Sequence, residues 1–313
     1  MRTRHLASLS FGLAAAVACA MGPMAAQSAA PAAAQAAQAA PSAPASVDLK
    51  VPNKKGTVKF GVIGDNGTGE REQYEIGEQL AKIQTTFPFD FVIMLGDNLY
   101  GSQNPRDFVK KFEDPYKALL ARDVKFYAAL GNHDNQENRF YKPWNMNGER
   151  FYTFKKDRVR FFVLDTDYLD QPQRQWIERQ LRESTDDWKI AYFHHPLYSS
   201  GKTHGSSLET RATLEPIFVK NGVNVVLTGH DHFYERIKLE QGIQHFVIGS
   251  GGSLRKGDLA RTDLTVKGYD QDYVFLLAEI AGDDFYYAAV SRKGQIIDSG
   301  DFKRSTTQAS PKP

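Results

Sequence analysis

Five short apolar runs in this chain each end at a turn that carries polar side chains able to bind a metal. The clearest run is 89–95, which stops at Gly96 and is followed by Asp97 and Tyr100. A continuous apolar run of this length predicts a strand that is buried on both faces. Open α/β sheets place their sites beyond the carboxyl ends of such strands, so we expect the five turns to meet. The other four runs are 60–63, 124–130, 190–193 and 223–228.

The segments between these strands have apolar residues at helical spacing, and the last part of the chain consists mainly of strand patterns. The expected helices are 70–87, 105–121, 173–182 and 208–219. The other expected strands are 151–154, 159–165, 244–248, 274–280, 285–291 and 295–302. Strand–helix units followed by hairpins predict an α/β fold in which two sheets pack together with helices outside. We therefore expect a four-layer α-β-β-α sandwich of two mixed sheets, with a dinuclear metal site at the strand ends.

The first 46 residues differ in composition from the rest of the chain. Arg2 and Arg4 precede an Ala-rich apolar stretch and small residues through Ala26, which is the pattern of a secretory signal peptide over 1–26. The apolar stretch is too short to span a bilayer, so a retained membrane anchor is the less favoured reading. Export to the periplasm or the medium is expected, and lipidation at Cys19 is the alternative to cleavage by signal peptidase.

The remaining chain is expected to be one domain. Residues 27–46 are an uncharged Ala/Pro/Gln-rich linker, 47–304 form the folded domain, and 305–313 are expected to be a disordered tail. Cleavage after Ala26 removes two of the 39 basic residues and leaves 37 against 37 acidic ones. This balance gives no sign of nucleic-acid binding. We expect no stable membrane association after cleavage, and a monomer.

The polar residues at the turns divide into two groups by their chemistry. Asp65 and Tyr100 offer hard anionic oxygens, and Asp97 can bridge, whereas Asn132 and three imidazoles are softer, neutral donors. The two histidines of the last turn are two residues apart, so their side chains point to the same side and can each meet a different ion. A phenolate beside two carboxylates favours a trivalent ion in the first group. Two adjacent metals can act together on an in-line displacement at phosphorus.

The ordered motifs G-D-N-G, G-D-N-L-Y, G-N-H-D, F-H-H-P and G-H-D-H resemble those of the purple acid phosphatases, a branch of the calcineurin-like metallophosphoesterases. The resemblance covers about residues 57–303. Gly67 stands where the wider superfamily usually has a second metal histidine, and Tyr100 supplies a phenolate instead. The segment H-H-P-L-Y-S-S-G-K-T-H-G is similar to the small, tartrate-resistant type. Asn66 departs from the Trp common in that type, and F-Y-E-R after His232 is closer to the plant branch.

The resemblance implies a centre of Fe(III) and a divalent metal, which would be Fe(II), Zn or Mn. Carried over by motif, the ligands are Asp65, Tyr100 and His232 for the ferric ion, Asn132, His194 and His230 for the divalent ion, and Asp97 between them. His195 is the weaker candidate of the adjacent pair. His133 and His204 are expected to contact the phosphate or to protonate the leaving oxygen, with Asn132 also touching the substrate. The catalytic candidates are therefore His133, His204 and Asp97.

The resemblance implies that residues 47–304 are a metallophosphoesterase domain. It also implies that the protein is an exported acid phosphatase with a small phosphorylated substrate. It would hydrolyse phosphate monoesters by attack of a metal-bound hydroxide, without a covalent enzyme intermediate. A histidine that acts as a general acid must be protonated, which indicates an acidic optimum. Two alternatives stay open: a phosphodiesterase or nucleotidase that uses the same centre, and a non-catalytic surface binding protein that retains the fold.

Overall fold

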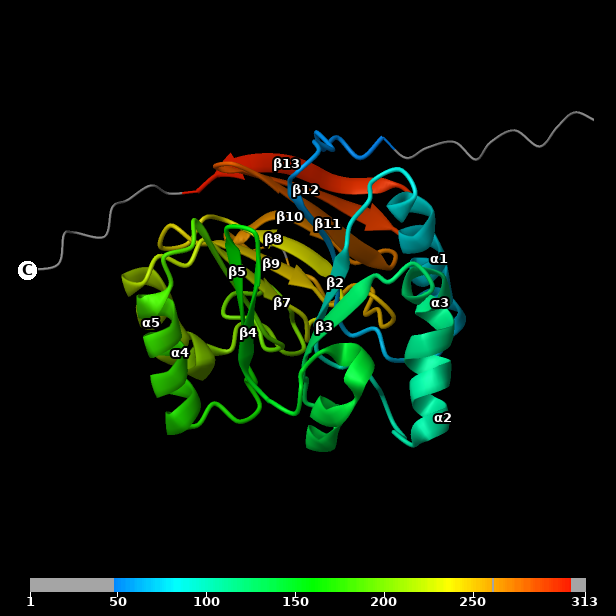
Figure 1. Ribbon diagram of the computed structural model, residues 1–313, viewed down its shortest axis with the longest axis horizontal. Helices are drawn as coiled ribbons and strands as arrows, with labels where there is room; N and C mark the ends of the chain where they lie inside the picture. Colours follow the sequence, from blue (N-terminus) through cyan, green and yellow to red (C-terminus); the bar gives the residue numbers. More distant parts are fainter. Residues whose placement is uncertain (1–47, 261, 305–313) are drawn as a thin grey trace, which may run out of the picture. The chain divides into compact units, whose positions relative to one another are not determined.

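The computed structural model describes residues 48–260 and 262–304 (Figure 1). The predicted signal peptide with Cys19, the linker and the carboxyl-terminal tail lie outside the described residues. Within those two ranges, no helix is both long enough and apolar enough to cross a membrane.

The first of two sheets has six strands in the order β13-β12-β11-β1-β2-β3. Its parallel part is β1 (Val58–Ile63), β2 (Phe91–Leu95) and β3 (Lys125–Ala129). The antiparallel part is β11 (Val274–Ala281), β12 (Asp284–Ser291) and β13 (Ile296–Lys303). Because β1, β2 and β3 are parallel neighbours, the turns that follow them lie at the same edge of the sheet.

The second sheet has seven strands in the order β10-β8-β9-β7-β6-β5-β4. Its parallel part is β5 (Val159–Val163), β6 (Trp188–Tyr192), β7 (Val225–Thr228) and β9 (Gln244–Ile248). The antiparallel strands are β4 (Tyr152–Lys156), β8 (Tyr234–Ile237) and β10 (Thr265–Tyr269). Both sheets are thus mixed, as expected.

Helices cover the outer face of each sheet (Figure 1). The helices α1 (Arg71–Gln84) and α3 (Asp114–Leu120) pack on the first sheet, and α4 (Gln171–Glu183) and α5 (Leu208–Lys220) pack on the second. A third buried cluster fills the space between the sheets. The four-layer α-β-β-α sandwich is therefore confirmed.

Strand β2 shows why the apolar runs have no polar alternation. Val92 and Met94 belong to the cluster under α1 and α3, whereas Phe91, Ile93 and Leu95 belong to the cluster between the sheets. Successive side chains of a strand point to opposite faces, and here both faces are buried. The strand therefore ends at its first polar position, which is where the site begins.

The helix expected over 105–121 is observed over 105–120, where it runs through three consecutive segments. These are α2 (Pro105–Phe108), a π-helical turn over Val109–Glu113, and α3. Pro115 has no N–H to donate to the carbonyl of Lys111, four residues earlier. That carbonyl accepts a hydrogen bond from the side chain of Gln73 on α1 instead, with a donor–acceptor distance of 2.5 Å.

Strands β8 and β10 were not expected from the sequence. Tyr234–Ile237 carries a glutamate and an arginine in its centre. The buried Glu235 accepts a hydrogen bond from the backbone N–H of Ser200, and Arg236 pairs with Asp298 at 2.7 Å. These partners are distant in sequence, so a local apolar pattern could not reveal the strand.

Candidate metal centre

The turns after β1, β2 and β7 hold predicted ligands in an uncommon backbone conformation. Asp65 and Asp97 each have φ of 52°, and His230 has φ of 70°. Non-glycine residues rarely adopt positive φ, and such residues cluster at functional sites. The neighbouring turns come close: a Cβ on Gly131 would lie 2.4 Å from Oδ1 of Asp97, and one on Gly229 would lie 2.4 Å from Oδ2 of Asp65. Glycine is therefore needed at both positions.

Three of the predicted ligands form a first donor group. The Oη atom of Tyr100 lies 3.2 Å from Oδ1 of Asp65 and 3.1 Å from Nε2 of His232. Nε2 of His232 is also 3.4 Å from Oδ1 of Asp65. These are the three residues that the resemblance assigns to the ferric ion.

Three others form a second donor group. Nε2 of His194 lies 3.0 Å from Oδ1 of Asn132 and 3.1 Å from Nδ1 of His230. Nδ1 of His230 is 3.1 Å from the same Asn132 oxygen. His230 and His232 thus belong to different groups, as expected for side chains that share one side of a turn.

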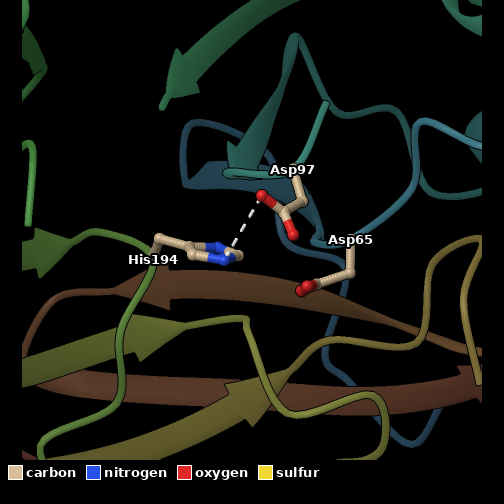
Figure 2. A group of neighbouring side chains, drawn as sticks. All are labelled: Asp65, Asp97 and His194. Atoms are coloured by element: carbon tan, nitrogen blue, oxygen red, sulfur yellow. Dashed lines mark ion pairs between the residues drawn. The ribbon is translucent and has the colours of Figure 1, made fainter. Parts of the chain in front are cut away.

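Asp97 connects the two groups. Its Oδ1 lies 3.4 Å from Nε2 of His194. Donor atoms of Asp65, Asp97 and His194 all lie within 4.8 Å of one another, and these three side chains are buried. Figure 2 shows the Asp97 carboxylate pointing toward both Asp65 and His194.

The separations within the two groups fit metal coordination. Nitrogen and oxygen ligands lie about 2.0 to 2.2 Å from a transition-metal ion, so two ligands at a right angle are about 3 Å apart. The observed spacings of 3.0 to 3.4 Å match that value. Each group combines the donor types that its expected ion prefers. The residues present therefore fit a pair of metal ions.

Hydrogen bonds from the surrounding backbone orient the donors. Nδ1 of His194 lies 2.9 Å from the carbonyl oxygen of Leu95. A carbonyl oxygen can only accept, so Nδ1 carries the proton and Nε2 is the atom available to a metal. The backbone N–H of His230 donates to Oδ2 of Asp65 over 2.8 Å, and that of His133 donates to Oδ1 of Asp97 over 2.9 Å.

Charges at the centre favour cation binding. Burial lowers the pKa of His194, but the carboxylates of Asp97 and Asp65 outweigh burial and raise it to about 10. Burial likewise raises the pKa of Asp97, but His194 outweighs it and holds this pKa below its usual range. A proton therefore occupies this pair when no metal is bound, and metal binding must displace it.

The phenol of Tyr100 indicates the same need for a cation. Burial raises the pKa of Tyr100 far above its usual value, and the nearby carboxylates of Asp65 and Asp97 raise it further. Ionisation of this phenol would add a third negative charge to a buried cluster. A bound cation reverses that balance and permits the phenolate.

The remaining histidine candidates surround the donor groups without joining them. His133 and His204 are exposed. The ring of His133 lies 4.9 Å from that of Tyr100, and the ring of His204 lies 4.2 Å from that of His230. Nδ1 of His195 lies 2.9 Å from the hydroxyl of Thr166, outside both groups.

Asp134 is a residue of the centre whose role sequence reasoning missed. Its carboxylate is buried and accepts hydrogen bonds from the backbone N–H groups of Asn98, Leu99 and Gly131, each with a donor–acceptor distance of 3.0 Å. It ties the turn after β2 to the turn after β3. Its position in the motif G-N-H-D was the available signal.

Gly67, where the wider superfamily usually has a metal histidine, has no space for a side chain. A Cβ at this position would lie 2.0 Å from the carbonyl oxygen of Asn98. The Tyr100 phenol, which the resemblance offers in place of that histidine, lies in the first donor group.

Comparison with known proteins identifies the family. Residues 58–234, more than half of the chain, match the family model described as calcineurin-like phosphoesterase. The chain belongs to the calcineurin-like phosphoesterase family. This phosphoesterase is 32% identical over 253 residues to purple acid phosphatase 3 of Arabidopsis thaliana, and the match covers 67% of each chain. It is 26% identical over 238 residues to tartrate-resistant acid phosphatase type 5 of Rattus norvegicus, covering 62% of this chain and 72% of the relative. The expected purple acid phosphatase resemblance is confirmed.

Solved structures share the fold of this phosphoesterase at lower identity. The purple acid phosphatase PPD1 from yellow lupin aligns with a TM-score of 0.68 and 18% identity over 82% of this chain and 55% of that chain. GAP50, the anchor in the inner membrane complex of Plasmodium, aligns with a TM-score of 0.71 and 21% identity over 81% of this chain and 90% of that chain. At these identities the likeness shows the fold alone.

Proposed function

We propose that this calcineurin-like phosphoesterase is an exported acid phosphatase that hydrolyses phosphate monoesters at a centre of Fe(III) and a divalent metal. The observation that carries the proposal is the pair of three-donor groups connected by Asp97. Relatives named as acid phosphatases support the reaction class. Export is proposed from the pattern of the first 26 residues.

The proposed ligands follow the two donor groups. Asp65, Tyr100 and His232 would hold Fe(III), and Asn132, His194 and His230 would hold Fe(II), Zn or Mn, with Asp97 between them. When bound, two such ions polarise phosphate oxygens and lower the pKa of water.

The exposed histidines would handle the substrate. His133 adjoins the first donor group and His204 adjoins the second. A phosphate placed across the two groups would therefore meet both rings, whose N–H groups can donate to its oxygens, and the Asn132 amide. In hydrolysis, a bond forms from a water oxygen to phosphorus while the bond from phosphorus to the alcohol oxygen breaks, and the attacking water gives up one proton to solvent. The departing alcohol oxygen takes a proton from the ring nitrogen of His133 or His204.

The test is hydrolysis of p-nitrophenyl phosphate and bis(p-nitrophenyl) phosphate by the metal-loaded protein from pH 4 to 9. We expect faster turnover of the monoester and an acidic optimum. Asp97→Ala should lower kcat about a thousandfold, because several kcal/mol of transition-state stabilisation depends on the metal pair. Asp90→Asn, an exposed change before β2, is the control.

Each alternative has its own outcome in that assay. Faster hydrolysis of the diester would contradict the proposed monoesterase activity and favour a phosphodiesterase that uses the same centre. If the metal-loaded protein hydrolyses neither ester, the proposed enzymatic activity is wrong and a binding protein that retains the fold is favoured.

A further inference from the structure

The loop over residues 199–205 follows β6 and carries His204. On one side it is held by the carboxylate of Asp231, a buried residue between two proposed metal ligands. Oδ2 of Asp231 accepts hydrogen bonds from the hydroxyl of Ser199 and, over 3.2 Å, from the backbone N–H of Gly205. The carboxylate therefore fixes both ends of the loop.

The middle of the loop lies directly against the same carboxylate. A Cβ on Gly201 would lie 2.5 Å from each oxygen of Asp231. No larger residue fits there unless the loop moves away from Asp231.

A second carboxylate holds the loop from the segment between β9 and β10. Oδ1 of the buried Asp258 accepts two hydrogen bonds from Thr203. One comes from the backbone N–H at 3.0 Å, and the other comes from the Thr203 hydroxyl. The backbone N–H of Lys202 donates to the carbonyl oxygen of Asp258 over 2.9 Å. Asp258 lies outside the turns that carry the proposed metal ligands.

These contacts determine where His204 lies. Its side chain is exposed, and its ring reaches the centre by packing on His230 at 4.2 Å. An exposed side chain gains little restraint from its surroundings, so the backbone on both sides must supply it. Thr203 and Gly205, the residues on both sides, are the ones that donate to Asp258 and Asp231.

We propose that Asp231 and Asp258 are positioning residues that hold the 199–205 loop and thereby place His204 over the metal centre. The inference rests on the proposed function, because it assigns His204 a part in phosphate ester turnover. Asp231 acts from the turn between the two donor groups, and Asp258 acts from the opposite side of the loop.

The first test is a double-mutant cycle on kcat/KM for p-nitrophenyl phosphate. One oxygen of each carboxylate accepts all of these side-chain hydrogen bonds and the other accepts none, so an asparagine could keep them and alanine is the informative change. Asp231→Ala and Asp258→Ala each remove the accepting oxygen, and each should lower kcat/KM about tenfold. In a His204→Ala background neither change should lower it further, since the role of both residues passes through His204. Asp90→Ala, at an exposed position, is the matched control. A full additional loss in the His204→Ala background would overturn the proposal.

The second test measures the loop itself and needs no turnover. Trypsin cleavage after Lys202, followed by mass spectrometry, should be several-fold faster in both variants than in the wild type and in Asp90→Ala. An unchanged rate would overturn the proposal. Faster cleavage in a protein that proves inactive would support the anchoring and contradict only the proposed function. If Asp231→Ala loses metal, Asp258→Ala carries the comparison.

Discussion

At the scale of single residues, the metal centre depends on carboxylates that bind no metal in the proposed scheme. Asp134 illustrates this: one buried side chain satisfies backbone N–H groups of two turns that deliver proposed ligands. Without such acceptors, the turn that holds Asp97 at positive φ would lose a constraint against relaxation. Asp134 therefore helps to hold the turns of the proposed donors together.

Asp134→Asn tests that organisation. The amide places an NH₂ group against backbone N–H donors, so at least one buried donor is left unpaired, which costs about 1 to 3 kcal/mol. We expect a corresponding loss in the free energy of unfolding, measured in urea, together with weaker metal retention on dialysis. Asp123→Asn, an exposed change before β3, is the control. Wild-type stability and metal retention in Asp134→Asn would contradict this role.

At the scale of elements, strand β9 carries a buried histidine away from the centre. Burial, with a smaller contribution from Arg211, lowers the pKa of His245 to about 3. The unfolded chain has a histidine pKa of about 6.5. Below pH 6.5 the unfolded state binds a proton that the folded state does not, so stability falls as the pH falls from 6.5 toward 3.

His245→Gln should remove that part of the acid sensitivity. Between pH 7 and pH 5 the wild type should lose about 2 kcal/mol of unfolding free energy through this one group. The variant should lose about that much less over the same range, whatever its stability at pH 7. Urea denaturation at both pH values measures the difference. An identical pH dependence in the two proteins would show that His245 is not held neutral in the fold.

Local pattern was sufficient for elements whose burial is periodic. It predicted β2 because both faces of that strand are apolar, and it predicted α1 because one face is. It failed for β8, since Glu235 and Arg236 are accommodated by partners distant in sequence. It did not reveal the π-helical turn before Pro115, where the side chain of Gln73 on another helix donates a hydrogen bond to the carbonyl of Lys111.

At the scale of the whole molecule, two parallel sheet halves bring five turns to one place. The sequence predicted that polar side chains of these turns meet, because each turn directly follows a buried strand, and the resemblance implied which of them are ligands. It could not predict the anchors: Asp231 and Asp258 gain their roles from a loop that begins at Ser199, more than thirty residues earlier in the chain. Each proposed donor therefore lies in a motif that the local sequence reveals, whereas the contacts that fix the substrate histidine are not visible in any local motif.

The most direct test of the proposed Fe(III)–divalent centre is the visible absorption spectrum of the purified protein, recorded with its metal content. The spectrum is compared with that of Tyr100→Phe. A tyrosinate bound to Fe(III) absorbs visible light, and a dizinc or dimanganese centre does not. We predict two metal ions per chain, iron among them, and a visible absorption band that the Tyr100→Phe variant loses. A colourless wild type that retains two metals would contradict the ferric assignment at Asp65, Tyr100 and His232, and a protein that holds fewer than two metals would contradict the dinuclear centre itself.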